Sequence, residues 1–337
     1  MRASFVIGIA LFFLVSFSLS GNEAAKPLAY TDLDRAVAWL IAQQGDDGFW
    51  RSAREGNSAP ELATAFAIDG LCFRPTPSAQ ASLTKAVDAL LASQSADGRF
   101  STNDVVHTLV TRSLNHYLES RLPLYLLKRD AVVEDARTKT IKTALRKAME
   151  VIFRLQDPVD GHWKSDNLLF SDLALTCLNI QCAISAKRTS LFDRSISTTL
   201  SAADTWLAKR PHHDDRAIAE ENPDELAEDV LLMNTRGIFL NSKEKDALGP
   251  VAMAVTQRFK TGLADTWLLC LFADSGGSFG WNSSLSIADV NKSFSKQLRD
   301  NGSITAQGRV SESGGQIIST SLMLWALRFR QGTCTGW

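Results

Sequence analysis

The stretch QQGDDGFW, residues 43–50, places a glutamine, a polar turn and an aromatic residue directly behind a short apolar helix pattern. Related stretches follow as QSADGRF (94–100), QDPVDGHW (156–163) and a divergent QLRDNGSI (297–304). Glycine lets the chain leave a helix with a positive φ, and the Asp before it in the first three copies can bind the following amides. The aromatic can cover the helix end, and the glutamine can satisfy exposed backbone groups there. The stretch is therefore interpreted as a repeated structural turn.

The turn motif is assigned a structural role, not a catalytic one. Its residues are Gln44, Gly48, Trp50, Gln94, Gly98, Phe100, Gln156, Gly161, Trp163, Gln297 and Gly302. The first three copies are each preceded by one helix pattern and followed by a second, more apolar one. Two helices per unit, at a period of roughly 50 to 60 residues, are typical of a helical array. Strand patterns are nearly absent, so the sequence predicts an all-α fold.

The spacing of glutamine, glycine and aromatic resembles the QW motif of the prenyltransferase and squalene-cyclase repeat superfamily. The segment WNSSLSIADVNKSFSKQLRDNGSI (281–304), followed by SGGQIISTSLMLWALRF (313–329), is similar to the closing repeat of secreted bacterial members. The resemblance extends from Asp32 to about Arg330. It implies an α/α toroid, in which about six pairs of outer and inner helices surround a central cavity.

Six apolar segments are expected to form the inner helices of this toroid. They are PELATAFAIDGL (60–71), VVHTLVTRSLN (105–115), FSDLALTCLNI (170–180), ELAEDVLLMNT (225–235), GLADTWLLCLF (262–272) and QIISTSLMLWAL (316–327). The fourth and fifth units lack the turn motif. The polar stretch RPHHDDRAIAEENPDE (210–225) is interpreted as a solvated loop, in which His212 and His213 form a solvated pair.

The N-terminus predicts secretion. Arg2 precedes the apolar run FVIGIALFFLVSF (5–17), and the small residues of Ser18-Leu19-Ser20 suit a signal peptidase. The apolar run is too short for a membrane span of about 20 residues. We expect a signal peptide at 1–20, a linker at 21–31 and the toroid at 32–337. The mature protein is then secreted or periplasmic, with no membrane span after cleavage.

Composition argues against nucleic acid as a partner. The chain has 337 residues, of which 45% are apolar, and a formal net charge of −1. Its densest basic stretch, ARTKTIKTALRK (136–147), alternates with apolar residues at helical spacing and indicates a solvated helix face. The five cysteines show no metal-binding or disulfide spacing, so neither a structural zinc nor a disulfide framework is expected.

Alignment of the apolar segments places polar residues at one level of successive inner helices. The first aligned column is Ala63, His107, Asp172, Asp229, Asp265 and Ser319, and the second is Thr64, Thr108, Leu173, Val230, Thr266 and Thr320. Carboxylates and hydroxyls favour the first turn of a helix, which is one explanation of the column. The alternative is a cavity-mouth site for a ligand or a divalent metal, formed by His107, Asp172, Asp229, Asp265, Thr108, Thr266, Ser319 and Thr320.

The catalytic signatures of the superfamily are missing. Its protein prenyltransferases hold zinc with Asp, Cys and His, but here Cys177 lies five residues after Asp172, on a different helix face. The Asp-x-Asp-Asp motif of triterpene cyclases is absent, and the closest string to Asp-Asp-x-x-Asp, DELAE (224–228), reads as a charged first turn. No serine-hydrolase elbow, zincin motif, phosphate loop or dinucleotide fingerprint occurs. No cofactor is predicted beyond the divalent metal.

These observations leave three functions open. The first is a secreted toroid that binds a hydrophobic, isoprenoid-like or extended ligand in its cavity without a requirement for catalysis. The second is a toroid enzyme, either a divergent terpenoid cyclase or a polysaccharide-degrading enzyme that uses a pair of the aligned carboxylates. The third is a structural or interaction module. Partners are accordingly a hydrophobic small molecule or a glycan, and the lining of the cavity distinguishes between them.

Overall fold

The computed structural model describes residues 30–52, 59–72, 74, 76–121, 135–167, 170–189, 191, 196–209, 223–237, 294–305 and 309–327. The helices in these ranges are α1 (Tyr30–Ala42), α2 (Pro60–Leu71), α3 (Pro77–Ser93), α4 (Asp104–Arg121), α5 (Ala136–Leu155), α6 (Asp172–Arg188), α7 (Ile196–Ala208), α8 (Pro223–Gly237) and α12 (Arg309–Ala326). Across these residues there is no named strand. No helix in the same ranges is long and apolar enough to cross a membrane.

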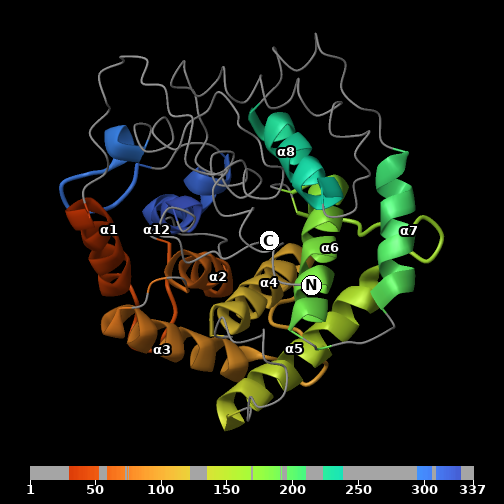
Figure 1. Ribbon diagram of the computed structural model, residues 1–337, viewed down its shortest axis with the longest axis horizontal. Coiled ribbons are helices and arrows are strands. Elements are labelled where there is room, and N and C mark those ends of the chain that lie inside the picture. The colour runs from red at the N-terminus through yellow and green to blue at the C-terminus, as the bar shows by residue number, and fades with distance from the viewer. Residues whose placement is uncertain are drawn as a thin grey trace, which may run out of the picture.

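The helices form two concentric layers, so the protein is an α/α toroid. Helices α1, α3, α5 and α7 lie on the outside, and α2, α4, α6, α8 and α12 lie inside them (Figure 1). Each inner helix packs on the next in the order α12, α2, α4, α6, α8. The last inner helix of the chain therefore lies beside the first one, which brings the two ends of the repeat together.

Hydrophobic patterning separates the two layers. In the outer helix α5 the buried residues include Ile141, Leu145 and Ile152 on one side, whereas Lys139 and Thr143 are exposed. In the inner helix α4 every residue from Val105 to Leu118 is buried. A helix with one apolar stripe covers a surface, whereas a helix buried on all sides lies inside the core. The sequence therefore assigns each helix to its layer.

The turn glutamines connect each turn to the next outer helix. Gln44 Nε2 donates to the carbonyl oxygens of Gly48, at 2.9 Å, and of Ser82 on α3, at 3.0 Å. Gln94 makes the equivalent pair of bonds to Gly98 and to Ala144 on α5, and Gln156 makes them to Gly161 and to Thr199 on α7. One amide group thus holds the turn closed and fixes its position on the neighbouring helix.

The turn glycines allow the same close approach, and the fourth turn closes the ring. Gly302 has a φ of 90°, and a Cβ there would lie 2.5 Å from the carbonyl oxygen of Arg35 on α1. In the third turn, Gly161 has a φ of 80°, and a Cβ there would lie 2.7 Å from the carbonyl oxygen of Ala202 on α7. Only glycine combines this φ with such contact. The divergent QLRDNGSI turn therefore docks on the first outer helix.

The predicted inner helices are present where the structure describes them. Helix α2 has the expected bounds, and α4 and α8 extend beyond the predicted segments at both ends. Helix α6 begins two residues after the predicted start and extends beyond the predicted end. Helix α12 contains a non-helical residue, Gly315, with a φ of 65°, so its regular part begins at the predicted start, Gln316. The fifth predicted inner helix (262–272), the signal peptide and most of the linker lie outside the described residues, as does most of the 210–225 loop.

We expect Trp50→Ala and Trp163→Ala each to lower the free energy of unfolding by about 3–5 kcal/mol. Both indoles are buried, and each Nε1 donates at 2.7 Å to a carbonyl of the preceding outer helix, Leu40 or Ile152. Denaturant unfolding measures the change. The control is Val159→Ala in the third turn, because Val159 is 89% exposed. Unchanged midpoints in both tryptophan variants would contradict the structural role of the turn.

Candidate functional site

A backbone hydrogen bond from each turn fixes the register of the inner helices. The amide N–H of the turn aromatic donates to Thr64 Oγ1 from Trp50 (3.0 Å) and to His107 Nδ1 from Phe100 (3.2 Å). In the third and fourth turns the acceptors are Thr176 Oγ1 and Thr320 Oγ1. These four acceptors occupy equivalent positions and face the outer layer.

The register differs from the one predicted from the apolar runs. His107 is equivalent to Thr176, which lies one helical turn after Asp172, and it is equivalent to Thr64 and Thr320 rather than to Ala63 and Ser319. The prediction aligned hydrophobic residues, but helices that are buried on all sides offer no unique apolar phase. The structure thus does not bring His107 and Asp172 to one level.

His107 has an architectural role in this register. Its Nδ1 accepts the Phe100 N–H, and its Nε2 lies 3.1 Å from the carbonyl oxygen of Ala148 on α5. Burial lowers the pKa of His107 to about 4. The ring is therefore neutral, protonated at Nε2, and uses both nitrogens to connect the second turn to an outer helix. It has no nitrogen left for a metal or a ligand.

The remaining predicted site residues have separate surroundings. Asp172 Oδ1 accepts the N–H of Ser165 at 2.7 Å, at the outer end of α6. Thr108 Oγ1 donates to Asn179 Oδ1 at 2.8 Å, and Ser319 Oγ donates to Gly315 O. Asp229 is buried on α8. Asp265 and Thr266 lie outside the described residues.

The corrected register identifies a different set of inward-facing positions. Five residues correspond to about 140° of rotation around a helix, so a residue five after each outward acceptor points toward the interior of the ring. These positions hold Asp69 on α2, Arg112 on α4, Gln181 on α6 and Trp325 on α12. The inner face therefore carries polar and aromatic side chains at these positions. A purely hydrophobic core would have aliphatic side chains there.

Three inner helices bring three of these side chains together with His116 of α4, and we call Asp69, Arg112, His116 and Trp325 the inward group. His116 Nδ1 lies 2.9 Å from Asp69 Oδ1, and Arg112 Nη1 lies 3.9 Å from Asp69 Oδ2. The Arg112 guanidinium lies over the Trp325 ring, 4.4 Å from its centroid. Helices α4 and α12 flank α2, so the contact between their side chains spans the inner side of α2.

The side chains of the inward group are almost inaccessible to solvent. The side chains of Asp69, Arg112 and His116 are 4%, 2% and 8% exposed. Arg112 Nε and Nη1, and Oδ1 of the neighbouring Asn115, have no hydrogen-bond partner among the described residues. Buried polar atoms without partners cost about 1–3 kcal/mol each, more where charged. The arrangement therefore offers donors and an acceptor to a polar ligand, together with a carboxylate–imidazole pair of the kind that transfers protons.

The sequence contains a weak indication of the inward group. Asp69, Arg112 and His116 are charged or titratable residues within otherwise apolar inner segments. A charge in such a segment must be paired or bind something. The prediction concentrated on the first turns of the helices, whereas Asp69 and Trp325 lie in the last turns of α2 and α12. The predicted site and the inward group therefore lie toward opposite ends of the inner helices.

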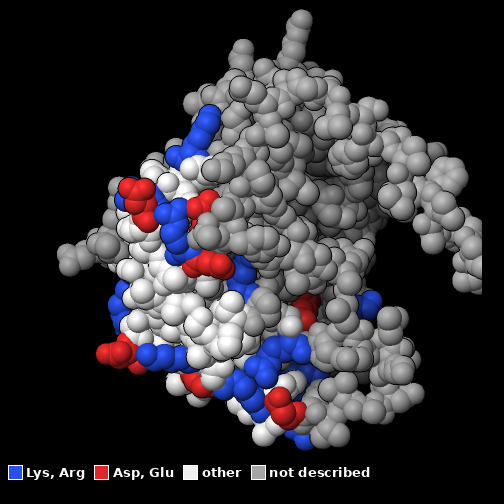
Figure 2. Space-filling model, turned by 60° about the vertical axis from the view of Figure 1, so that its left-hand side comes forward, with Lys and Arg blue, Asp and Glu red and all other residues white. Residues whose placement is uncertain are grey.

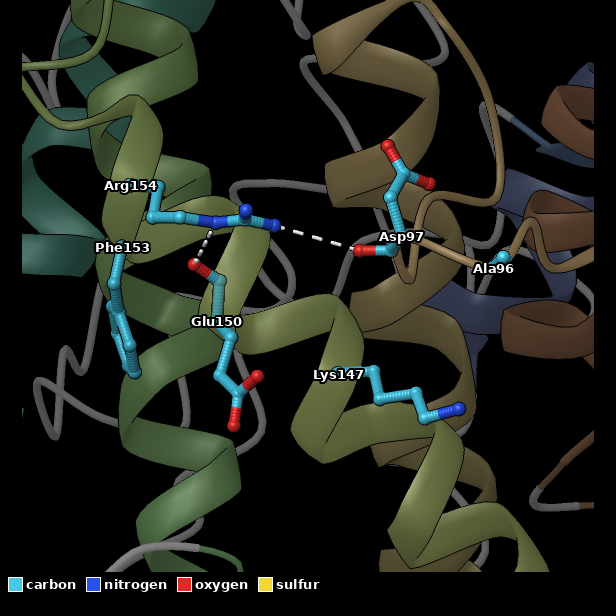
Figure 3. Close-up of a pocket in the computed structure, with 6 residues that line it drawn as sticks. All are labelled: Ala96, Asp97, Lys147, Glu150, Phe153 and Arg154. Carbon is cyan, nitrogen blue, oxygen red and sulfur yellow. Dashed lines mark hydrogen bonds between the residues drawn. The ribbon is translucent and has the colours of Figure 1, made fainter.

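A shallow depression lies on the exposed outer surface of the ring. It has a volume of about 540 Å³ and is lined by Ala96, Asp97, Lys147, Glu150, Phe153 and Arg154, between the second turn and α5 (Figure 3). Arg154 reaches the backbone carbonyls of Glu150 and Asp97 there. Acidic and basic side chains are interspersed over the described surface in Figure 2. The described part of the face shown there therefore presents mixed charge.

The described cysteines are unsuited to nucleophilic chemistry. Cys72, Cys177 and Cys182 are buried free thiols. Burial raises the pKa of both Cys177 and Cys182 to about 12. Because the thiolate is the reactive form, these two side chains act as small apolar residues of the inner helices.

Comparison with known proteins supports the fold. No protein-family model matches the chain, and no curated protein matches it in sequence. A protein from Actinoplanes has 13% identity and a TM-score of 0.55, over 89% of this chain and 98% of its own. The GH76A α-1,6-mannanase of a Salegentibacter species has 12% identity and a TM-score of 0.56, over 88% and 98%. The type II terpene cyclase MstE from Scytonema, at 11% identity and 90% and 98% coverage, reaches only 0.39.

The likenesses to the Actinoplanes protein and to the mannanase agree with the two-layered arrangement of helices. At such identities they establish the fold alone. The protein is an α/α toroid, the architecture predicted from the turn motif.

We expect the stability of the protein to fall as the pH is lowered from about 6.5 to 4, with a contribution from His107. Its folded-state pKa, about 4, lies below the unfolded value of 6.5, so the unfolded chain binds the extra proton in this window. A shift of this size corresponds to about 3 kcal/mol. His107→Thr, which places at this position the residue found at 64, 176 and 320, should flatten the profile of unfolding free energy against pH. Equal slopes in both proteins would contradict the assignment.

Proposed function

We propose that this protein is a secreted toroid that binds an extended, hydroxyl-rich ligand, a glycan, on its inner face beside the inward group. The observation that carries the proposal is the buried polar cluster of Asp69, Arg112 and His116 on the neighbouring inner helices α2 and α4. An interior that served only as a scaffold would be more stable with apolar residues of similar size at these positions.

The inner face fits a polar ligand better than an isoprenoid. Arg112 Nε and Asn115 Oδ1 lack hydrogen-bond partners among the described residues. A hydrocarbon ligand could not form hydrogen bonds with these two atoms. Hydroxyl groups of a sugar can accept from the guanidinium and donate to the amide oxygen.

The fold can hold such a ligand. A solved structure of an inactive variant of the Salegentibacter mannanase contains α-1,6-mannotetrose, and this toroid aligns with our chain at a TM-score of 0.55. Hydrolysis of a glycosidic bond requires two carboxyl groups about 5–10 Å apart. The inward group supplies one, Asp69, so the proposal is for binding rather than turnover.

We expect the purified protein to bind one or more members of a panel of neutral oligosaccharides that includes α-1,6-mannotetrose, as measured by isothermal titration calorimetry. Arg112→Lys and Asp69→Asn should each weaken binding about tenfold or more, because a lysine cannot replace the guanidinium fork and an amide cannot replace the carboxylate. Circular dichroism would verify that each variant is folded.

The matched control is Lys147→Ala in the outer depression, which should leave the dissociation constant unchanged. Geranylgeraniol in detergent serves as the hydrophobic probe. Binding of geranylgeraniol without any oligosaccharide would overturn the proposal in favour of an isoprenoid ligand. Glycan binding that survives both Arg112→Lys and Asp69→Asn would place the site elsewhere.

Secretion is part of the proposal and rests on the apolar run at 5–17 and on Ser18-Leu19-Ser20. We expect the mature protein from its native host to begin near Gly21. N-terminal sequencing of the purified protein measures this directly. A mature chain that begins at Met1 would contradict the assignment of residues 1–20 as a cleaved signal.

A further inference from the structure

The third turn carries side chains that the first two turns do not. The position after the turn glutamine is Asp157, where the other turns have Gly45 and Ser95, and the position before the aromatic is His162, where they have Phe49 and Arg99. With Asp160, which the other turns share as Asp, the third turn therefore combines two carboxylates and an imidazole. These are the side chains that bind divalent metal ions.

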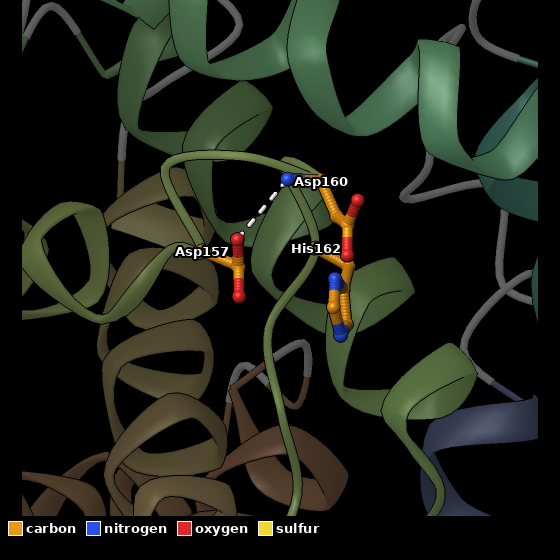
Figure 4. A group of neighbouring side chains, drawn as sticks. All are labelled: Asp157, Asp160 and His162. Carbon is orange, nitrogen blue, oxygen red and sulfur yellow. Dashed lines mark hydrogen bonds between the residues drawn. The ribbon is translucent and has the colours of Figure 1, made fainter.

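The three side chains are close enough to share one ion. One ligand atom from each of Asp157, Asp160 and His162 lies within 4.8 Å of the other two. Zinc–oxygen and zinc–nitrogen distances of about 2.0–2.2 Å place the ligand atoms of a tetrahedral site about 3.3–3.6 Å apart, so small side-chain rotations would bring these three atoms onto one ion. In Figure 4 the His162 ring lies next to the Asp160 carboxylate, with Asp157 on the other side of the gap.

His162 is the observation that separates this cluster from an ordinary acidic turn. The residue is only 6% exposed, yet its Nδ1 has no hydrogen-bond partner among the described residues. The ring is stacked on Trp206 of α7, at 4.7 Å between centroids and 4° between planes. A buried imidazole held in one orientation with an unused nitrogen is prepared to bind a ligand.

The other nitrogen of His162 faces a second carboxylate. Its Nε2 lies 3.7 Å from Asp172 Oδ2, at the start of α6. Metal-binding histidines commonly direct their second N–H to a carboxylate, which fixes the tautomer and makes the metal-binding nitrogen more basic. At 3.7 Å the two atoms are in ionic contact without a hydrogen bond, and Asp172 would act on the ion only through the imidazole.

Asp157 is already oriented by hydrogen bonds within its own turn. Its Oδ1 accepts the N–H groups of Val159, at 2.9 Å, and Asp160, at 3.0 Å. Lys164 Nζ lies 3.1 Å from Asp157 Oδ2. Lys164 occupies an oxygen that an ion needs, but its side chain is 71% exposed and can turn into solvent. Lys164 is therefore a competitor for the metal.

We propose that Asp157, Asp160 and His162 form a binding site for a divalent transition-metal ion, with Zn²⁺ as the best match, at the third turn of the toroid. The nitrogen ligand favours such an ion over Ca²⁺ or Mg²⁺, which prefer oxygen. Three protein ligands leave a coordination position for water. The bound ion connects the third turn, α6 and α7 through His162, so it stabilises this part of the ring.

The test is calorimetric titration of Zn²⁺ into the metal-free full-length protein, with Co²⁺ absorption as a second readout of tetrahedral coordination. We expect one ion per chain and a higher melting temperature with Zn²⁺. His162→Phe, which introduces the residue of the first turn and keeps the stacking on Trp206, should weaken this binding at least 100-fold. Asp172→Asn should weaken it about 10-fold through the orientation of His162. Lys164→Met should strengthen it.

Two control variants identify the source of any signal. Asp97→Asn changes the carboxylate of the second turn, and its Zn²⁺ affinity should equal that of the original protein. The double variant His212→Ala/His213→Ala removes the histidine pair of the 210–225 stretch, and it too should retain the site. Unchanged Zn²⁺ binding by His162→Phe would overturn the proposal, as would loss of binding in the double variant alone.

Discussion

The hydrogen bonds from the turn glutamines to the next outer helix are the contacts on which the toroid depends. Each amide nitrogen binds one carbonyl in its own turn and one in the neighbouring helix, as Gln94 does with Gly98 and Ala144. The adjacent glycine lets the two backbones meet without a Cβ between them. The first three turns are each attached to the following outer helix, and the turn at Gly302 is attached to α1, so local turn chemistry joins the described units and brings the last turn back to the first helix.

The same turns determine which side of each inner helix faces outward. The aromatic N–H needs an acceptor in a buried place, and a threonine hydroxyl or the neutral His107 ring supplies it. This bond fixes the rotation of the inner helix, so the inward side chains follow from helical geometry. His107, which the sequence alignment placed in a possible site, therefore serves the architecture, whereas Asp69 and Arg112, which that alignment did not include, reach the interior.

The polar interior has an energetic consequence for function. Removal of a guanidinium, a carboxylate and an imidazole from water costs several kcal/mol per ion unless partners compensate for it. The contacts of Arg112 with Asp69 and Trp325 compensate in part, while two of its nitrogens have no hydrogen-bond partner among the described residues. A bound polar molecule would complete the compensation. The third turn also contains a buried polar atom without a hydrogen-bond partner among the described residues, His162 Nδ1.

The sequence by itself determined the fold class, the helical layers and the turns, because these depend on local chemistry: glycine at positive φ, glutamine beside a helix end, and apolar stripes of different width. It did not determine the register of the inner helices. Helices such as α2 and α4 are buried all round, so hydrophobicity cannot distinguish His107 from Thr108 as the outward residue. Only the tertiary structure decided this, because hydrogen bonds such as Phe100 N–H to His107 join residues of separate elements. The meeting of Asp69, Arg112 and Trp325 likewise depends on the packing of α12 beside α2, a contact between opposite ends of the chain that no local pattern encodes.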